Sequence, residues 1–139
     1  MRLHHIGVAT ANLRESIDAY AVMGFAAGEV IHDPLQKVDI CFLEKDGDPV
    51  IELVCPANAA SPVGNILRKN GTMPYHTCYE VKNLEVEIAR LRAFKFVTAV
   101  RPLPAVAFGM RRVCFLYNKA VGLIELLESA ECLAEQSTP

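Results

Sequence analysis

Cys41-Phe42-Leu43-x7-Ile51-Glu52-Leu53 is a motif that occurs twice in this chain. The second copy is Cys114-Phe115-Leu116-x7-Ile124-Glu125-Leu126. The two copies are offset by 73 residues (125 − 52). Upstream, positions 5, 12, 13, 17 and 25 recur as identical residues at 76, 83, 84, 88 and 96, with an offset of 71 (76 − 5). A repeat of this length predicts two copies of one structural unit.

Each copy carries one histidine near its start and one glutamate near its end. These are His5 and Glu52 in the first copy and His76 and Glu125 in the second. If the two halves fold alike and pack about a pseudo-twofold axis, the two imidazoles and two carboxylates converge on one point. Such a donor set binds a divalent cation. The sequence therefore predicts a metal site at these four residues, with nickel, cobalt or zinc as the ion.

Each of these residues has an ordinary interpretation when it is taken alone. A single histidine on a strand is more often a packed or exposed residue than a ligand. Side chains alternate along a strand, so each glutamate points away from its apolar neighbours and could simply face solvent. Two arguments favour the metal site. The same His and Glu are present in both halves, which chance does not explain. A carboxylate among apolar residues is also unfavourable unless it is solvated or paired.

Alternation, turn residues and helix caps predict the same β-α-β-β-β order in both halves. The first half has a helix that begins after Asn12 and ends at Gly24, and strands at 3–10, 26–31, 37–43 and 49–54. The second half has a helix that begins after Asn83, and strands at 75–81, 96–100, 112–116 and 123–127. Prolines and a glycine in 101–109 predict a loop.

The connection between the halves covers residues 55–73. Ser61 is expected to cap a short helix at 63–69, with Pro62 at its first helical position. One half alone leaves an apolar sheet face open, so the two halves must share a core. We therefore expect one α+β domain over residues 1–139, with internal repeats at about 3–54 and 74–127 and a tail at 129–139.

Composition limits the classes of partner. The chain has 139 residues, of which 52% are hydrophobic and 22% charged, as in an ordinary globular protein. The net charge of −2 and the pI near 6.1 argue against a nucleic-acid partner. Apolar runs are far shorter than the roughly 20 residues of a membrane helix. The first residues lack the apolar segment of a signal peptide, so a cytoplasmic protein is expected.

The five cysteines show no CxxC spacing. Four of them, at positions 41, 55, 78 and 114, lie in apolar runs that are typical of strands, where cysteine usually acts as a small buried hydrophobe. These four are interpreted as reduced core residues. Cys132, in the tail, is expected to be the exposed thiol.

Several other polar residues are candidates with two interpretations. His4 and His32 have no equivalent in the other half, which favours a structural or exposed position. Gln36 and Asp39 could face the cavity, although they could equally keep a sheet edge soluble.

Arg111 and Arg112 could neutralise an anionic substrate, but a solvated pair at a strand end is the favoured interpretation. Tyr75 and Tyr79 flank His76. Ordinary packing is expected for them, and one of the two could line the pocket.

The chain resembles the vicinal-oxygen-chelate superfamily over residues 3–128. This superfamily includes glyoxalase I, methylmalonyl-CoA epimerase, extradiol dioxygenases and bleomycin-resistance proteins. The segments that carry the resemblance are His5-Ile6-Gly7-Val8-Ala9, Ile51-Glu52-Leu53, Ser61-Pro62, and residues 75–81 and 122–126. The resemblance implies paired βαβββ modules that form an incomplete barrel around a metal, the glyoxalase-like fold, and a homodimer.

Two enzyme branches of the superfamily are similar to different parts of the chain. The ligand order His5, Glu52, His76 and Glu125 resembles glyoxalase I, which implies a lyase of the lactoylglutathione lyase type. The Ser61-Pro62 connector resembles methylmalonyl-CoA epimerase, the alternative. The epimerase pattern has His-His where this chain has Tyr75-His76, and the approach to the last strand also differs.

Both branches imply one kind of chemistry. A divalent ion chelates a carbonyl oxygen of the substrate, and a carboxylate removes the proton on the adjacent carbon. Glu125, with Glu52 on the other side, would be the catalytic pair. Return of the proton to the neighbouring carbon isomerises a hemithioacetal, whereas return to the opposite face epimerises an acyl-CoA thioester.

Two further classes remain open at the level of sequence. An extradiol dioxygenase would need only His5, His76 and Glu125 as a facial triad, and the additional carboxylate of Glu52 argues against it. A metal-free small-molecule binding or resistance protein would need none of these ligands, and the retention of all four argues against that class.

Overall fold

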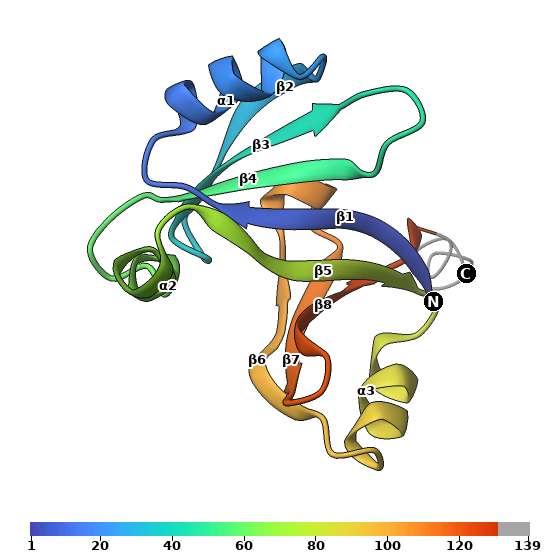
Figure 1. Ribbon diagram of the computed structural model, residues 1–139. Coiled ribbons are helices and arrows are strands. Elements are labelled where there is room, and N and C mark those ends of the chain that lie inside the picture. Colours follow the sequence, from blue (N-terminus) through green and yellow to red (C-terminus); the bar gives the residue numbers. More distant parts are fainter. Residues whose placement is uncertain (131–139) are drawn as a thin grey trace. The chain divides into compact units, whose positions relative to one another are not determined.

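The structure is a computed structural model that describes residues 1–130 (Figure 1). Contacts within the chain divide it into two compact units. One unit is His5–Tyr75, and the other joins Met1–His4 to the part of the chain from His76 onward. Most of the predicted tail and the exposed thiol predicted at Cys132 lie outside the described residues.

The first unit contains four strands and two helices. The strands are β1 (Arg2–Ala9, which enters the unit at His5), β2 (Ala26–Asp33), β3 (Val38–Glu44) and β4 (Val50–Pro56), and the helices are α1 (Leu13–Val22) and α2 (Val63–Asn70). The strand order is β2-β3-β4-β1. β1 runs parallel to β4, and the other neighbours are antiparallel. The elements of the first repeat therefore follow the predicted β-α-β-β-β order.

The second unit repeats the β-α-β-β-β order, with a short 3-10 helix added between its second and third strands. Its strands are β5 (Met73–Val81, which enters the unit at His76), β6 (Val97–Pro104), β7 (Arg112–Asn118) and β8 (Gly122–Glu128), and its helices are α3 (Leu84–Arg92) and the short η1 (Val106–Phe108). The strand order is β5-β8-β7-β6, with β5 parallel to β8 and antiparallel pairs elsewhere. The predicted α+β class with tandem βαβββ modules is confirmed.

The first helix of each module begins at an equivalent asparagine. The side chain of Asn12 accepts a hydrogen bond from the backbone amide of Glu15 at 3.2 Å. Asn83 accepts one from the amide of Val86 at 2.9 Å. Both asparagines have extended backbone angles, as an N-cap residue requires. The cap that the repeat predicts is therefore present in both modules.

In each unit the strands pack one face against the unit's own first helix (Figure 1). In the first unit this core consists of Val8, Cys41, Leu43 and Leu53, with Leu13, Ile17, Tyr20, Phe25 and Ile51 around it. In the second it consists of Val81, Leu84, Ile88, Leu91, Cys114, Leu116, Ile124 and Leu126, with Tyr79 and Phe96 around it. Because side chains alternate along a strand, the residue between two core positions points to the opposite face. Glu52 and Glu125 occupy such positions.

The loop predicted at 101–109 is wrong over its first part. β6 continues to Pro104, where Leu103 pairs with Val113 and Pro104 with Arg112 on β7. β6 is the last strand in the order of its sheet, and an edge strand tolerates prolines because the missing amide is not needed for a second neighbour. The register shifts between Val100 and Leu103, around the first proline.

The predicted cap of α2 is also wrong in detail. Pro62, not Ser61, is the N-cap residue, and it already has helical angles (φ −64°, ψ −23°). The backbone carbonyl of Ser61 accepts the amide of Gly64 at 3.2 Å, whereas its hydroxyl, which is buried, has no hydrogen-bond partner within the described residues. The predicted helix itself is present.

The cysteines agree with their interpretation as core residues. Cys41, Cys78 and Cys114 are buried free thiols, and Cys55 is half-buried. Burial raises the pKa of Cys114 to about 11. No helix within residues 1–130 is long and apolar enough to cross a membrane.

Candidate metal centre

The first unit brings His5 and Glu52 together on adjacent parallel strands. Glu52 on β4 pairs with Gly7 on β1. His5 lies two residues before Gly7 and therefore points to the same face as Gly7. The Nε2 atom of His5 is 3.1 Å from the Oε2 atom of Glu52, and the side chains are 0% and 4% exposed. The structure thus brings together two of the four residues that the repeat predicts as ligands.

The second unit builds an equivalent pair by the same register. Glu125 on β8 pairs with Cys78 on β5, and His76 lies two residues before Cys78. The Nε2 atom of His76 is 3.2 Å from the Oε2 atom of Glu125, and the side chains are 1% and 3% exposed. The solvent-facing interpretation of the two glutamates is therefore wrong, because both carboxylates are buried beside an imidazole.

The donor atoms of each pair suit a metal ion. Imidazole nitrogen and carboxylate oxygen bind zinc and similar ions at about 2.0–2.2 Å. Two ligand atoms at about 2.1 Å from one ion and at right angles to each other are about 3.0 Å apart, by simple geometry from those bond lengths. The separations of 3.1 and 3.2 Å lie close to that value. A buried carboxylate also needs a cationic or hydrogen-bonding partner, which a metal ion would provide.

A phenylalanine accompanies each pair. Phe42 on β3 pairs in register with Glu52, and its ring meets the imidazole of His5 with centroids 5.9 Å apart and planes at 71°. Phe115 on β7 pairs with Glu125 and meets His76 at 5.3 Å and 86°. Both phenylalanines belong to the repeated motif, yet no role was predicted for them from the sequence. Their recurrence between Cys and Leu was the available signal.

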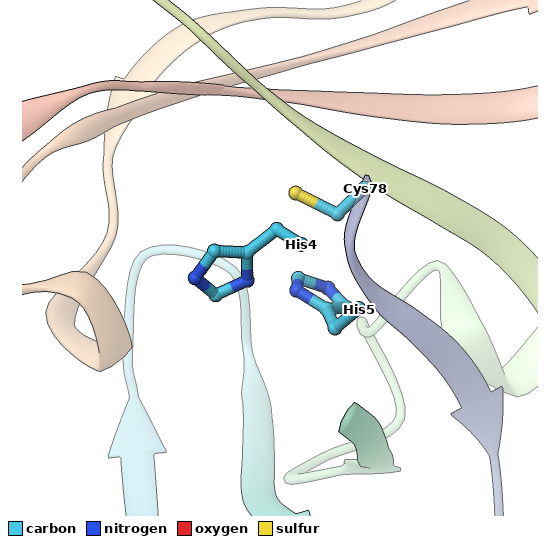
Figure 2. A group of neighbouring side chains, drawn as sticks. All are labelled: His4, His5 and Cys78. Carbon is cyan, nitrogen blue, oxygen red and sulfur yellow. The ribbon is translucent and has the colours of Figure 1, made fainter. Parts of the chain in front are cut away.

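His4 lies on β1 immediately before His5, and it has no equivalent in the other half. It is partly exposed, and its ring lies edge-on to that of Phe108 at 5.5 Å. A ring nitrogen of its imidazole also lies within 4.8 Å of the buried thiol of Cys78. Figure 2 draws these two side chains together with His5. His4 thus fits the structural position expected for it.

The residues near the β2–β3 turn bind to one another. The Nδ1 atom of His32 is 2.7 Å from the Oδ1 atom of Asp39 in an exposed pair. Gln36 donates from its side-chain amide to Asp33 at 3.0 Å. These contacts agree with the exposed position expected for His32. The side chains of Gln36 and Asp39 bind nearby residues of the same turn, so no contact with a cavity is needed to account for them.

The two arginines at the start of β7 form ion pairs rather than a solvated pair, which corrects their interpretation. Arg111 lies 3.1 Å from Glu80. Arg112 donates to Glu128 at 2.7 Å and 2.9 Å and also binds Glu85. These hydrogen bonds raise the pKa of Arg112 above its ordinary range and lower the pKa of Glu85.

The comparison with protein families assigns the class. Residues 4–115 match the family model described as the glyoxalase/bleomycin resistance protein/dioxygenase superfamily. The chain belongs to this superfamily, which confirms the resemblance seen in the sequence.

Several of the individual relatives have the name methylmalonyl-CoA epimerase. The chain is 32% identical over 131 residues to the mitochondrial methylmalonyl-CoA epimerase of Dictyostelium discoideum, and the match covers 91% of this chain and 78% of that protein. The crystal structure of methylmalonyl-CoA epimerase from Mycobacterium tuberculosis has a TM-score of 0.81 at 26% identity, over 96% of this chain and 91% of that one. A Streptomyces coelicolor methylmalonyl-CoA epimerase in complex with 2-nitronate-propionyl-CoA has a TM-score of 0.78 at 27% identity. The match covers 94% of this chain and 95% of that one.

These relatives bear on the fold, on the prediction of an enzyme, and on the choice between its two branches. They confirm the glyoxalase-like fold and the prediction of an enzyme, which included an acyl-CoA epimerase. They support the epimerase alternative better than the glyoxalase I type that was the main interpretation.

Proposed function

We propose that this chain is a metal-dependent epimerase that acts on methylmalonyl-CoA or on a closely similar acyl-CoA thioester. The observation that carries the proposal is the pair of buried His–Glu contacts, built by the same strand register in both modules. The relatives support the choice of substrate, since proteins with the name methylmalonyl-CoA epimerase match nearly the whole chain.

The proposed metal ligands are His5, Glu52, His76 and Glu125, and the proposed ion is nickel, cobalt or zinc. Two nitrogen and two oxygen donors suit these ions. The fit of each pair to adjacent positions around one ion supports the assignment. When bound, the cation would polarise the thioester carbonyl and acidify the adjacent carbon.

The two glutamates would perform the proton transfers. A carboxylate has two oxygens, so one oxygen can bind a cation while the other accepts a proton. In the proposed reaction Glu125 takes the proton from the carbon next to the carbonyl, and the electron pair of that C–H bond delocalises into the carbonyl group. Glu52, which would carry a proton taken up from water, delivers that proton to the opposite face of the same carbon, and Glu125 would release its own proton to water. The net result is inversion at that carbon with no change in composition.

A lyase of the glyoxalase I type remains the second candidate. The observation in its favour is that both modules supply a histidine and a glutamate, in the order His5, Glu52, His76 and Glu125. The same two carboxylates would then return the proton to the neighbouring carbon of a hemithioacetal. The homodimer and the cytoplasmic location stay predictions.

The test compares the two substrates in heavy water. Purified protein loaded with Co²⁺, Ni²⁺ or Zn²⁺ is incubated with one epimer of methylmalonyl-CoA, and separately with the hemithioacetal of glutathione and a 2-oxoaldehyde. The proposal predicts deuterium at the carbon next to the thioester together with loss of optical purity, and predicts that a chelator stops both. Turnover of the hemithioacetal alone would assign the chain to the second candidate. Exchange that continues unchanged after removal of the metal would exclude a metal-dependent epimerase.

A further inference from the structure

Two phenylalanines of the repeated motif lie on the face that carries the candidate ligands. We propose that Phe42 and Phe115 are positioning residues, each of which holds the imidazole ring of its module in the orientation that presents Nε2 to the glutamate. This inference deepens the proposed function and rests on it, because it assigns these imidazoles to a metal centre.

Strand register places each phenylalanine beside its pair. Phe42 on β3 lies opposite Glu52 on β4, and Glu52 lies opposite Gly7 on β1. The three neighbouring strands thus present Phe42, Glu52 and His5 on one face. Both the glutamate and the phenylalanine contact the same imidazole, at 3.1 Å between Nε2 and Oε2 and at 5.9 Å between ring centroids.

The second unit repeats this arrangement with its own residues. Phe115 on β7 lies opposite Glu125 on β8, and its ring is 5.3 Å from that of His76, close to perpendicular at 86°. Two aromatic contacts of one geometry, each next to a His–Glu pair, indicate a shared function. A general need for apolar volume would not require an aromatic ring in both places.

The imidazole needs such a neighbour for a physical reason. The last torsion of a histidine side chain has broad minima, so rotation about it moves Nε2 at little energetic cost. An edge-to-face contact favours one plane of the imidazole, because the positive edge of one ring meets the negative face of the other. The phenylalanine thereby restricts the rotation that would turn Nε2 away from the carboxylate.

The chain also supplies a matched control. Phe25 and Phe96 are another repeated pair, but they pack on the helix side of their sheets. Phe25 contacts Tyr20 edge-to-face at 5.4 Å. Of the phenylalanines that recur in the repeat, each module therefore has one on the face of the candidate ligands and one on the face of the helix.

The experiment measures the affinity for Co²⁺ by competition with a chelator, together with the visible absorption spectrum of the bound ion. The variants are Phe42→Leu and Phe115→Leu, with Phe25→Leu and Phe96→Leu as controls. Loss of one aromatic contact should weaken Co²⁺ binding about two- to tenfold and alter the spectrum. The control variants should have a lower melting temperature than the natural protein, but the same Co²⁺ affinity and the same spectrum of the bound ion. Phe42→Tyr, which keeps the ring, should restore the affinity to that of the natural protein.

Unchanged affinity in both Phe42→Leu and Phe115→Leu would overturn the proposal, as would an equal loss of affinity in the controls. A natural protein that binds no divalent ion would instead refute the metal centre of the proposed function. The positioning role is then decided by crystal structures of the metal-free variants. A displaced or disordered His5 ring in Phe42→Leu supports it, and an Nε2 atom that keeps its contact with Glu52 in one conformer overturns it.

Discussion

His5 and Glu52 form a buried contact between two parallel strands, with 3.1 Å between Nε2 and Oε2 and no more than 4% exposure of either side chain. An isolated carboxylate in such a place is strongly unfavourable. The imidazole compensates part of that penalty, and a divalent ion would compensate the rest. The contact between His76 and Glu125 has the same form in the other module.

Removal of one proposed ligand tests the metal centre. His5→Ala should weaken the binding of Co²⁺ or Zn²⁺ by more than about 100-fold, because loss of a residue that only supports a ligand already costs about 10- to 100-fold. Isothermal titration calorimetry measures the affinity. His32→Ala is the control, since His32 is exposed and pairs only with Asp39 among the contacts described for it. Equal affinities in His5→Ala and His32→Ala would exclude His5 as a ligand.

Conversion of each proposed base to its amide tests the proton transfers. Glu125→Gln should keep the fold, because the side-chain volume is nearly unchanged, and should lower kcat about 10²- to 10⁴-fold, because an amide does not accept the proton. Glu52→Gln should be comparably damaging in a two-base epimerase and less damaging in a one-base isomerase. The control is Glu29→Gln, on the exposed surface of β2. Full activity of Glu125→Gln with metal still bound would mean that the base is another residue.

Much of the fold follows from local signals that recur. Asn12 and Asn83 precede apolar residues at helical spacing, and each caps a helix. The His–Glu pairs could be predicted because the same two residue types recur at matched positions of the repeat, which makes chance a poor explanation. Side-chain alternation predicts only that Glu52 and Glu125 point away from the helix, and their burial is seen in the structure alone.

Other features depend on neighbours that are distant in the sequence. Pro104 is a strand residue because β6 is an edge strand, and strand order was not deducible from the prolines themselves. Arg112 binds Glu85 and Glu128, which come from a helix and a strand separated from it by 27 and 16 residues. The contact of Phe42 with His5 likewise requires the order of three strands.

The ion pairs of Arg112 should contribute to stability. Glu128 is buried, and Arg112→Met would remove both hydrogen bonds that Arg112 donates to it. The free energy of unfolding should fall by about 1–3 kcal/mol, which is the penalty for a buried polar group without its partner. A larger loss is not expected, because Arg112 itself is partly exposed. Urea unfolding measures the change. Arg14→Met, which removes an exposed pair with Asp18, should change it by less than about 1 kcal/mol. Similar losses in the two variants would show that burial of Glu128 is unimportant.

The thiol of Cys114 predicts how stability depends on alkaline pH. Burial raises its pKa from 9.0 to about 11. Because the folded-state pKa is the higher one, the neutral thiol stabilises the folded protein fully below pH 9, and this contribution is lost as the pH rises through about 11. Between these values the loss is about 1.4 kcal/mol per pH unit, so that about 2–3 kcal/mol disappears in total.

Cys114→Val lacks the titrating group and keeps an apolar side chain at this position. Urea unfolding of both proteins under reducing conditions at pH 8, 9.5 and 11 gives the difference in their free energies of unfolding. Groups elsewhere titrate equally in both proteins, so they cancel in that difference. The natural protein should therefore lose stability relative to Cys114→Val by about 2 kcal/mol between pH 8 and pH 11. A difference that is constant over this range would show that Cys114 ionises as easily in the folded protein as in the unfolded chain.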